Sequence, residues 1–277
     1  MSQEVRISAI NGTKLYGDLY YKESEQLQPL IVFVHGFKGF KNWGGFPYML
    51  EQLSKSGYNG ACFNFSHNGV SNERPEEFVR LYLFAKNTFS KELDELGYII
   101  DYFYEKADNF NIDRKRIALI GHSRGGGISI IKASSDSRIK CLVTLASVSH
   151  FDRYSDKLKN EWRSKGYIEV ENSRTKQMMR MDVTLLEDIE KNTDTLNICS
   201  AVSKLKIPAL FIHGKEDLAV RCSEAEEIYE SSNKELTELF LLENTGHTFG
   251  VTHPFSGTTD AFERVIGRMK SFLNVHL

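Results

Sequence analysis

The sequence predicts an α/β fold in which a mostly parallel sheet is covered by helices on both faces. Its strand-length segments are continuously apolar rather than alternating, which is typical of parallel strands buried on both sides. Segments with apolar residues three or four positions apart lie between them and indicate amphipathic helices. This repeated strand and helix pattern favours a parallel sheet. The buried strands are expected at 30–34, 61–65, 117–120, 141–145, 207–212 and 239–242.

The first 21 residues are the exception, because their apolar residues alternate. Residues 5–10 and 15–21 flank Asn11-Gly12, a strong turn signal, and predict an antiparallel hairpin at a sheet edge. The first buried strand follows and ends at His35-Gly36-Phe37. Helices are expected at about 48–55, 90–107 and 259–273, with others from Ile128 and around Ala225.

The segment Ile117–Ile128 carries the most specific signal in the chain. An apolar strand stops at Gly121-His122-Ser123-Arg124-Gly125, and the glycines lead into a helical segment. This spacing is typical of a nucleophile elbow, in which a strained serine stands above the end of the sheet. Ser123 is also expected to cap the following helix, whose positive end favours developing negative charge. A phosphate-binding loop would need Lys-Ser/Thr after its last glycine, whereas Ile128 follows Gly127.

Residues 149–201 differ in character from the rest of the chain. They carry many charges, Trp162 and three methionines, and no buried-strand pattern. We therefore expect residues 1–148 and 202–277 to form the core and 149–201 to form an inserted cap of helices and short hairpins. An insertion here leaves the sheet at the edge where the serine lies. The alternatives are a cap that shapes a substrate pocket and a surface excursion with a small core of its own.

Composition excludes several classes of protein. The 277 residues are 41% hydrophobic and 26% charged, with a net charge of −2, so no basic excess indicates a nucleic-acid partner. No signal core or membrane-length apolar segment is seen, and a cytoplasmic protein without a membrane partner is expected. The cysteines lack metal-ligand or paired spacing and are expected to be free thiols, mostly buried: Cys62, Cys141, Cys199 and Cys222.

A nucleophilic serine requires a base and a group that orients that base. In a fold of this type the partners follow as Ser, Asp/Glu, His, each after a core strand. Asp217 follows one predicted strand and His247 the next, so both are predicted to meet Ser123 at one end of the sheet. Glu216 and Glu243 remain reserve acids.

The other histidines fit the catalytic order less well. We expect His35 and His213 to be structural or to support the site, because each follows a strand but lacks an acid in the required order. His67 and His122 lie in loops without such an acid, and His253 lies further from a strand end. The open alternative for Asp217 is that it caps the helix that follows it.

Acyl transfer also needs two backbone N–H donors for the oxyanion. One is expected from Arg124, the residue after the nucleophile, and the other from Phe37 in the loop after the first buried strand. Gly36 has no side chain that would block the approach of the oxyanion to the Phe37 N–H. Because only the backbones are used, the side chains of Phe37 and Arg124 are free to contact substrate or to do nothing.

These motifs together resemble the α/β-hydrolase superfamily, over about 210 residues. The elbow and the His-Gly-Phe loop are similar to serine-nucleophile esterases near the dienelactone-hydrolase-like and feruloyl or cinnamoyl esterase groups. The resemblance implies an eight-stranded core with its second strand antiparallel, no metal or organic cofactor, and an acyl-enzyme mechanism. Dienelactone hydrolases proper have cysteine where this chain has Ser123, which makes ring-opening of lactones a weaker expectation.

The sequence thus predicts a serine hydrolase that cleaves a small-molecule carboxylic ester. A serine aminopeptidase or acyl-peptidase would share every residue named above and would need an acidic cluster in its pocket. The cap does carry acids that could serve: Glu169, Glu171, Asp182, Glu187 and Asp188. A ligand-binding protein on the same fold is the non-enzymatic alternative. Neither the substrate nor the oligomeric state follows from the sequence.

Overall fold

The structure is a computed structural model that describes residues 1–8 and 12–277. Its main sheet has eight strands in the order β1-β2-β4-β3-β5-β6-β9-β10. β2 pairs antiparallel with β1 and β4, and the remaining pairs are parallel. The strands are β1 (Ser2–Ser8), β2 (Lys14–Tyr20), β3 (Gln28–Val34), β4 (Asn59–Asn64), β5 (Ile112–His122), β6 (Ile139–Leu145), β9 (Ala209–Gly214) and β10 (Thr237–Leu242).

This sheet confirms the predicted fold class, including the eight strands and the antiparallel second strand. The edge pairing of β1 with β2 agrees with the predicted hairpin, although Asn11 of the predicted turn lies outside the described residues. β9 begins at Ala209, two residues later than expected. Pro208 has no N–H to donate to a neighbouring strand, which places it before the strand.

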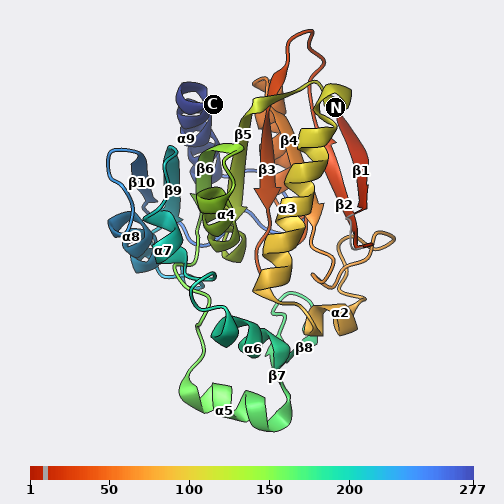
Figure 1. Cartoon of the computed structure of the whole chain (residues 1–277), viewed down its shortest axis with the longest axis vertical. Helices are drawn as coiled ribbons and strands as arrows, with labels where there is room; N and C mark the ends of the chain where they lie inside the picture. The colour runs from red at the N-terminus through yellow and green to blue at the C-terminus, as the bar shows by residue number, and fades with distance from the viewer. Residues whose placement is uncertain (9–11) are drawn as a thin grey trace.

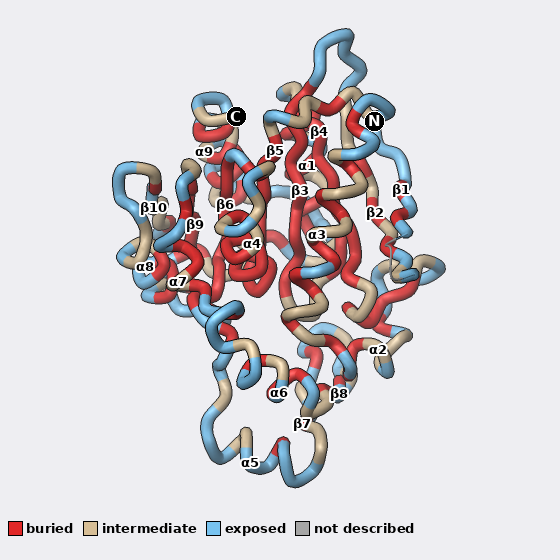
Figure 2. Tube along the Cα trace, in the orientation of Figure 1, coloured by how far each residue is buried: buried red, intermediate tan, exposed pale blue. Residues whose placement is uncertain are grey.

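Two buried clusters cover the two faces of the sheet. One contains side chains of α1 (Phe46–Lys55) and α9 (Asp260–His276), and the other contains side chains of α3 (Phe89–Glu105) and α4 (Arg124–Ser135). Figure 1 shows α3 and α4 on one side of the sheet, and Figure 2 shows the central strands as mostly buried. α8 (Cys222–Glu230) covers the β9 and β10 end.

Several helices differ from expectation in detail. The four expected at about 48–55, 90–107, 259–273 and around Ala225 occur with ends shifted by a few residues. The short helix α2 (Leu81–Ala85) and the 3₁₀ turn η1 (Ala107–Phe110) were not predicted. Segments this short carry little periodicity, and Phe84 of α2 packs against Phe78 and against the distant Phe37.

The segment between β6 and β9 forms α5 (Asp156–Lys165), β7 (Tyr167–Glu171), β8 (Met178–Asp182), α6 (Thr184–Lys191) and α7 (Ile198–Val202). β7 and β8 pair as a separate antiparallel hairpin. Trp162 is fully buried and donates from Nε1 to the carbonyl of Met181 at 3.0 Å. The buried side chains of the segment between β6 and β9 belong to the same cluster as those of α3 and α4, so this segment packs onto the core. Figure 1 shows α5, α6 and the hairpin beyond one end of the sheet.

The parallel register brings the carboxyl ends of the central strands together. Val34 pairs with Gly121, and His122 pairs with Leu145 on the other side of β5. The residues that follow these strands therefore emerge at one edge, where the α5–α7 segment also begins. Within residues 1–8 and 12–277, no helix is both long enough and apolar enough to cross a bilayer.

Candidate active site

Ser123 lies between the end of β5 and the start of α4, with φ 56° and ψ −123°. A non-glycine residue at positive φ is strained, and such strain persists only where the surroundings impose it. Here Ser123 N donates to the Leu145 carbonyl at 2.8 Å, and Ser123 O accepts from Gly126 N at 2.9 Å. The predicted strand, strained serine and helix are thus present in order.

One expectation about this serine is wrong. Ser123 occupies the N-cap position of α4, but its side chain makes no capping hydrogen bond. Side-chain capping normally accompanies a β-region backbone at the N-cap, and Ser123 is held at positive φ instead. Its hydroxyl is therefore not tied to the helix end.

The glycines around Ser123 allow backbones to approach one another closely. A Cβ at Gly36 would lie 2.9 Å from Ser123 Cβ, and one at Gly121 would lie 2.3 Å from the Gly125 carbonyl oxygen. A Cβ at Gly125 would meet the carbonyl oxygens of Val34 at 2.3 Å and His35 at 2.5 Å. The loop after β3 therefore lies directly against the elbow.

We expect Gly125→Ala to lower the free energy of unfolding by about 3 kcal/mol, because the two carbonyl oxygens are backbone atoms that cannot swing away. Gly267→Ala is the matched control, since a Cβ there has nothing within 4 Å in α9. It should raise stability by about 0.5–1 kcal/mol through helix propensity. Urea denaturation of the two variants checks both signs. Equal effects would contradict the close packing of the elbow.

Asp217 and His247 form the best-defined polar pair at this edge. His247 Nδ1 lies 2.7 Å from Asp217 Oδ2. Asp217 Oδ1 accepts from the N–H groups of Ala219 at 2.8 Å and Val220 at 2.9 Å, and the Asp217 side chain is fully buried. The helix that follows has Arg221 at its N-cap, so the alternative that Asp217 caps α8 is wrong.

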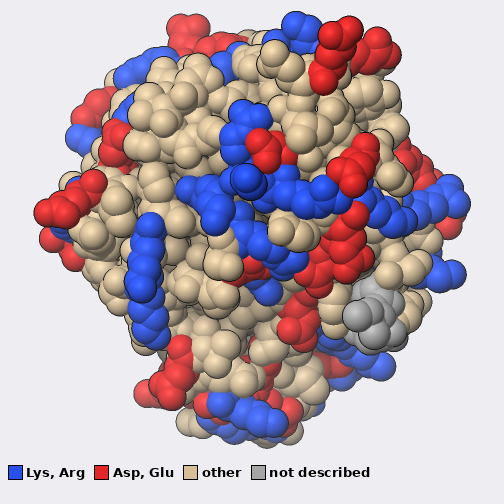
Figure 3. Space-filling model, turned by 45° about the horizontal axis from the view of Figure 1, so that its top comes forward, with Lys and Arg blue, Asp and Glu red and all other residues tan. Residues whose placement is uncertain are grey.

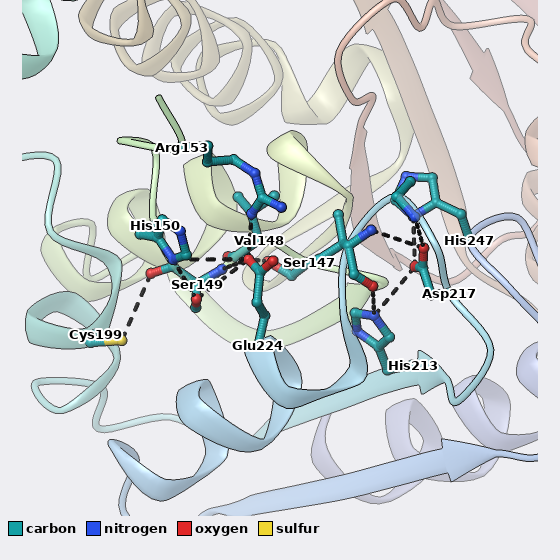
Figure 4. Close-up of polar contacts among 12 residues, drawn as sticks. Ser147, Val148, Ser149, His150, Arg153, Cys199, His213, Asp217, Glu224 and His247 are labelled. Atoms are coloured by element: carbon teal, nitrogen blue, oxygen red, sulfur yellow. Dashed lines mark hydrogen bonds and ion pairs between the residues drawn. The ribbon is translucent and has the colours of Figure 1, made fainter. Parts of the chain in front are cut away.

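His213 contacts the same carboxylate from the other side (Figure 4). Its Nε2 lies 2.9 Å from the Val220 carbonyl oxygen and 3.3 Å from Asp217 Oδ2. Burial alone would raise the pKa of Asp217, but hydrogen bonds from His213 and His247 outweigh burial and hold that pKa well below its usual range. Asp217 is thus kept as a carboxylate that can orient His247.

Ser123 and His247 line one cavity of about 470 Å³. No hydrogen bond joins the Ser123 hydroxyl to His247 among the described residues. Such contacts are often long in unliganded enzymes and tighten when substrate binds. The reserve acids Glu216 and Glu243 fit the role of orienting His247 less well than Asp217, because both are exposed and Glu243 pairs with Lys215.

The remaining histidines have structural contacts. His35 is buried, with Nδ1 3.0 Å from the Gly36 carbonyl oxygen and Nε2 accepting from Phe65 N–H at 3.3 Å. His122 Nε2 lies 3.0 Å from the His247 carbonyl oxygen. His67 contacts Ser66 and Lys91, and His253 Nδ1 accepts from Gly44 N–H at 3.0 Å.

His35 should make the fold sensitive to acid. Burial, opposed by the Gly36 hydrogen bond and reinforced by Arg124, lowers its pKa from 6.5 to about 4. Between these values the unfolded chain binds more protons than the folded one, so stability falls as pH falls. We expect wild type to lose about 2 kcal/mol more than His35→Gln between pH 7 and pH 5. Urea titrations at both pH values measure this. Burial raises the pKa of Glu95 to about 7, but Glu95 is present in both proteins, so its contribution to the pH dependence cancels in the difference. Equal losses would contradict a buried neutral His35.

Phe37 and Arg124, the expected oxyanion donors, both line the cavity with Ser123. The Arg124 side chain is largely buried, with its guanidinium 4.9 Å from the Phe37 ring centre and Nη2 2.6 Å from Glu92 Oε1. Glu92 also accepts from Asn87 Nδ2 at 2.6 Å. Sequence reasoning did not identify Glu92. A signal existed, since Glu92 interrupts the apolar stripe of α3.

The cavity has a further set of lining residues that the sequence did not indicate. Lys38 comes from the loop after β3, Arg153 from the stretch before α5, and Arg174 from the turn between β7 and β8. Arg153 pairs with Glu224 at 2.5 Å, as Figure 4 shows. These positions are far apart in the chain, so only the fold brings them together.

The family model of the alpha/beta hydrolase fold matches residues 29–186, more than half of the chain. The chain belongs to this family. A curated Mycoplasma pneumoniae protein named as an esterase/lipase is 27% identical over 122 residues, which are 43% of this chain and 38% of that protein. The match therefore spans less than half the length of that relative.

Solved structures show the same fold at low sequence identity. The alpha/beta hydrolase GrgF from Penicillium is 18% identical with a TM-score of 0.75, covering 100% of this chain and 99% of that one. Est1E from Butyrivibrio proteoclasticus, solved with ferulic acid bound, is 17% identical with a TM-score of 0.72, covering 98% of each chain. A dienelactone hydrolase from Anabaena variabilis is 16% identical with a TM-score of 0.64, covering 100% and 99%. The resemblance noted from the sequence thus holds for the fold.

Proposed function

We propose that the protein is a serine hydrolase that cleaves carboxylic esters through an acyl-enzyme on Ser123. The observation that carries the proposal is the Asp217–His247 hydrogen bond beside a cavity that the strained Ser123 also lines. This is the arrangement that a weak hydroxyl nucleophile requires, with an oriented base and a buried carboxylate behind it.

In the proposed mechanism, Ser123 Oγ attacks the acyl carbon and His247 Nε2 takes its proton. Asp217 holds Nδ1 of His247 protonated and stabilises the imidazolium that forms. The backbone N–H groups of Phe37 and Arg124 bind the oxyanion of the tetrahedral intermediate. His247 then gives this proton to the leaving alcohol. In the second half of the reaction, His247 takes a proton from the water that attacks the acyl carbon and returns it to Ser123 Oγ as the acid leaves.

We further propose that residues 149–201 act as a cap over the substrate. The segment contributes Phe151, Tyr154 and Asn172 to the cavity lining, beside residues of the core. Phe151 also stacks on Phe89 of α3 at 4.1 Å between ring centres. The proposed cap thus supplies an apolar wall where an acyl or aryl group can be buried.

The alternative of a serine aminopeptidase is less well supported. Recognition of a substrate α-amino group requires a carboxylate in the pocket, and no Asp or Glu is among the described residues that line the cavity. The cap acids instead lie elsewhere. Asp182 pairs with Arg180, Glu171 with Lys176, and Asp188 accepts from Ser90 N–H.

The proposal is tested with 4-nitrophenyl esters from acetate to laurate beside an aminoacyl-4-nitroanilide. We expect ester turnover with a medium-chain optimum and no anilide cleavage. Preferential cleavage of the anilide would favour the peptidase. A folded protein that hydrolyses none of them and does not react with a fluorophosphonate would instead favour a ligand-binding role.

A further inference from the structure

The charges around the cavity are of one sign. Among the described residues that line it, four are Lys or Arg and none is Asp or Glu: Lys38, Arg124, Arg153 and Arg174. The outer surface is different, since Figure 3 shows Lys and Arg mixed with Asp and Glu on one face of the molecule. A cavity lined by one sign of charge concentrates ligands of the opposite sign.

Two of the four cations are neutralised by carboxylates behind them. Arg124 pairs with the fully buried Glu92 at 2.6 Å, and Arg153 pairs with Glu224 at 2.5 Å. These two pairs hold the arginines in place, and their charges are largely cancelled. These two arginines are therefore part of the cavity wall and offer little net charge to a ligand.

The other two cations have no carboxylate partner within ion-pair distance among the described residues. Lys38 Nζ donates to the backbone carbonyl of Glu171 at 2.9 Å. Arg174 donates to the backbone carbonyl of Glu76 at 3.4 Å, with its guanidinium 5.8 Å from the Phe40 ring centre. A carbonyl accepts a hydrogen bond but does not cancel a full charge. Neither cation is therefore neutralised by the carbonyl that it contacts.

Lys38 is also partly removed from water. Burial lowers its pKa, and the Glu171 charge only partly opposes this. A bound anion would supply the missing countercharge in a site where charge interactions are stronger than in bulk water. Lys38 follows the proposed oxyanion donor Phe37, whereas Arg174 approaches from the β7–β8 turn, so such an anion would contact both the core and the overlying segment.

We propose that the natural substrate is a negatively charged ester, with an anionic group held by Lys38 and Arg174 while Ser123 attacks the ester carbon. This inference rests on the proposed esterase function and adds its substrate class. The anionic group belongs to either the acyl or the alcohol part. Neutral esters bind without this contact.

The test uses three 4-nitrophenyl esters with acyl chains of matched length. They are the monoesters of adipic acid, of its monoamide and of 6-aminohexanoic acid, which are anionic, neutral and cationic. A second pair, 4-carboxyphenyl and 4-carbamoylphenyl hexanoate, places the charge on the alcohol side. In at least one series, kcat/KM for the anionic ester should exceed that for the neutral ester by roughly tenfold, and salt should reduce the ratio.

The double variant Lys38→Gln/Arg174→Gln should bring that ratio close to one. Lys157→Gln is the matched control, because Lys157 lies exposed in α5 outside the cavity lining, and it should leave the ratio unchanged. If both esters lose activity equally in the double variant, the cations act on the oxyanion and not on the substrate charge. An anionic-to-neutral ratio near one in the wild type would likewise overturn the proposal.

Calorimetry on Ser123→Ala separates this proposal from the esterase function. The anionic ester should bind that variant roughly tenfold more tightly than the neutral one, whether or not the wild type turns either over. Selective binding without turnover would support the charge selectivity and contradict the esterase. Turnover of both esters without charge preference in catalysis or binding would leave the esterase standing and overturn the anionic substrate.

Discussion

Ser123→Ala should abolish ester hydrolysis, with kcat falling by about 10⁴- to 10⁶-fold. The hydroxyl is the only reactive group of this side chain. Its removal leaves the active site with the proposed oxyanion donors at Phe37 and Arg124 but without a nucleophile. Turnover of a 4-nitrophenyl ester measures the loss. A residual rate above the uncatalysed reaction is expected from these donors and from substrate binding alone.

Ser134→Ala is the control for the serine variant. Ser134 lies towards the other end of α4, where its hydroxyl donates to the Ile131 carbonyl. The kcat of Ser134→Ala should stay close to that of the wild type. Circular dichroism and urea midpoints show whether each variant is folded. A folded Ser123→Ala that retained substantial turnover would remove Ser123 from the mechanism.

Asp217→Asn should lower kcat by about 10⁴-fold while the fold is kept. An amide donor would face His247 Nδ1 in place of the carboxylate, which favours the wrong tautomer and leaves the imidazolium unsupported. The neighbouring histidine His213 would lose the same partner at 3.3 Å. Because the Asp217 side chain is fully buried, water cannot replace the carboxylate.

Glu216→Gln is the control for the aspartate variant, since it removes an exposed carboxylate one residue away. Its activity should be close to that of the wild type. Michaelis–Menten kinetics of the two variants, each with its urea midpoint, provide the comparison. A larger loss of kcat in Glu216→Gln than in Asp217→Asn would show that Asp217 is not the acid that orients His247.

Much of the fold could be predicted because its signals are local. Continuous apolar strands specify a parallel sheet, and in such a sheet residues after the strand ends meet at one edge. For this reason the sequence alone placed Asp217 beside His247, as the structure has them. The elbow at Ser123 was predicted from glycine spacing, which reports how closely backbones approach there.

Other features depend on contacts between distant segments. Glu92 reaches Arg124 from another helix, and Lys38 and Arg174 converge on the cavity from two separate loops. No spacing in the sequence reports such convergence. The expected capping hydrogen bond of Ser123 is absent for a related reason. The strained backbone of Ser123 depends partly on its contact with Leu145 of the neighbouring strand, which the residues of the following helix do not reveal.

The most direct test of Ser123 as the nucleophile is to treat the protein with a fluorophosphonate and map the modified residue by mass spectrometry. We expect one adduct, on the peptide that contains Ser123. The adduct should be absent from Ser123→Ala and should form far more slowly in His247→Gln, in which the base is removed. A folded wild type that stays unmodified, or an adduct that persists in Ser123→Ala, would contradict the assignment of Ser123 as the nucleophile.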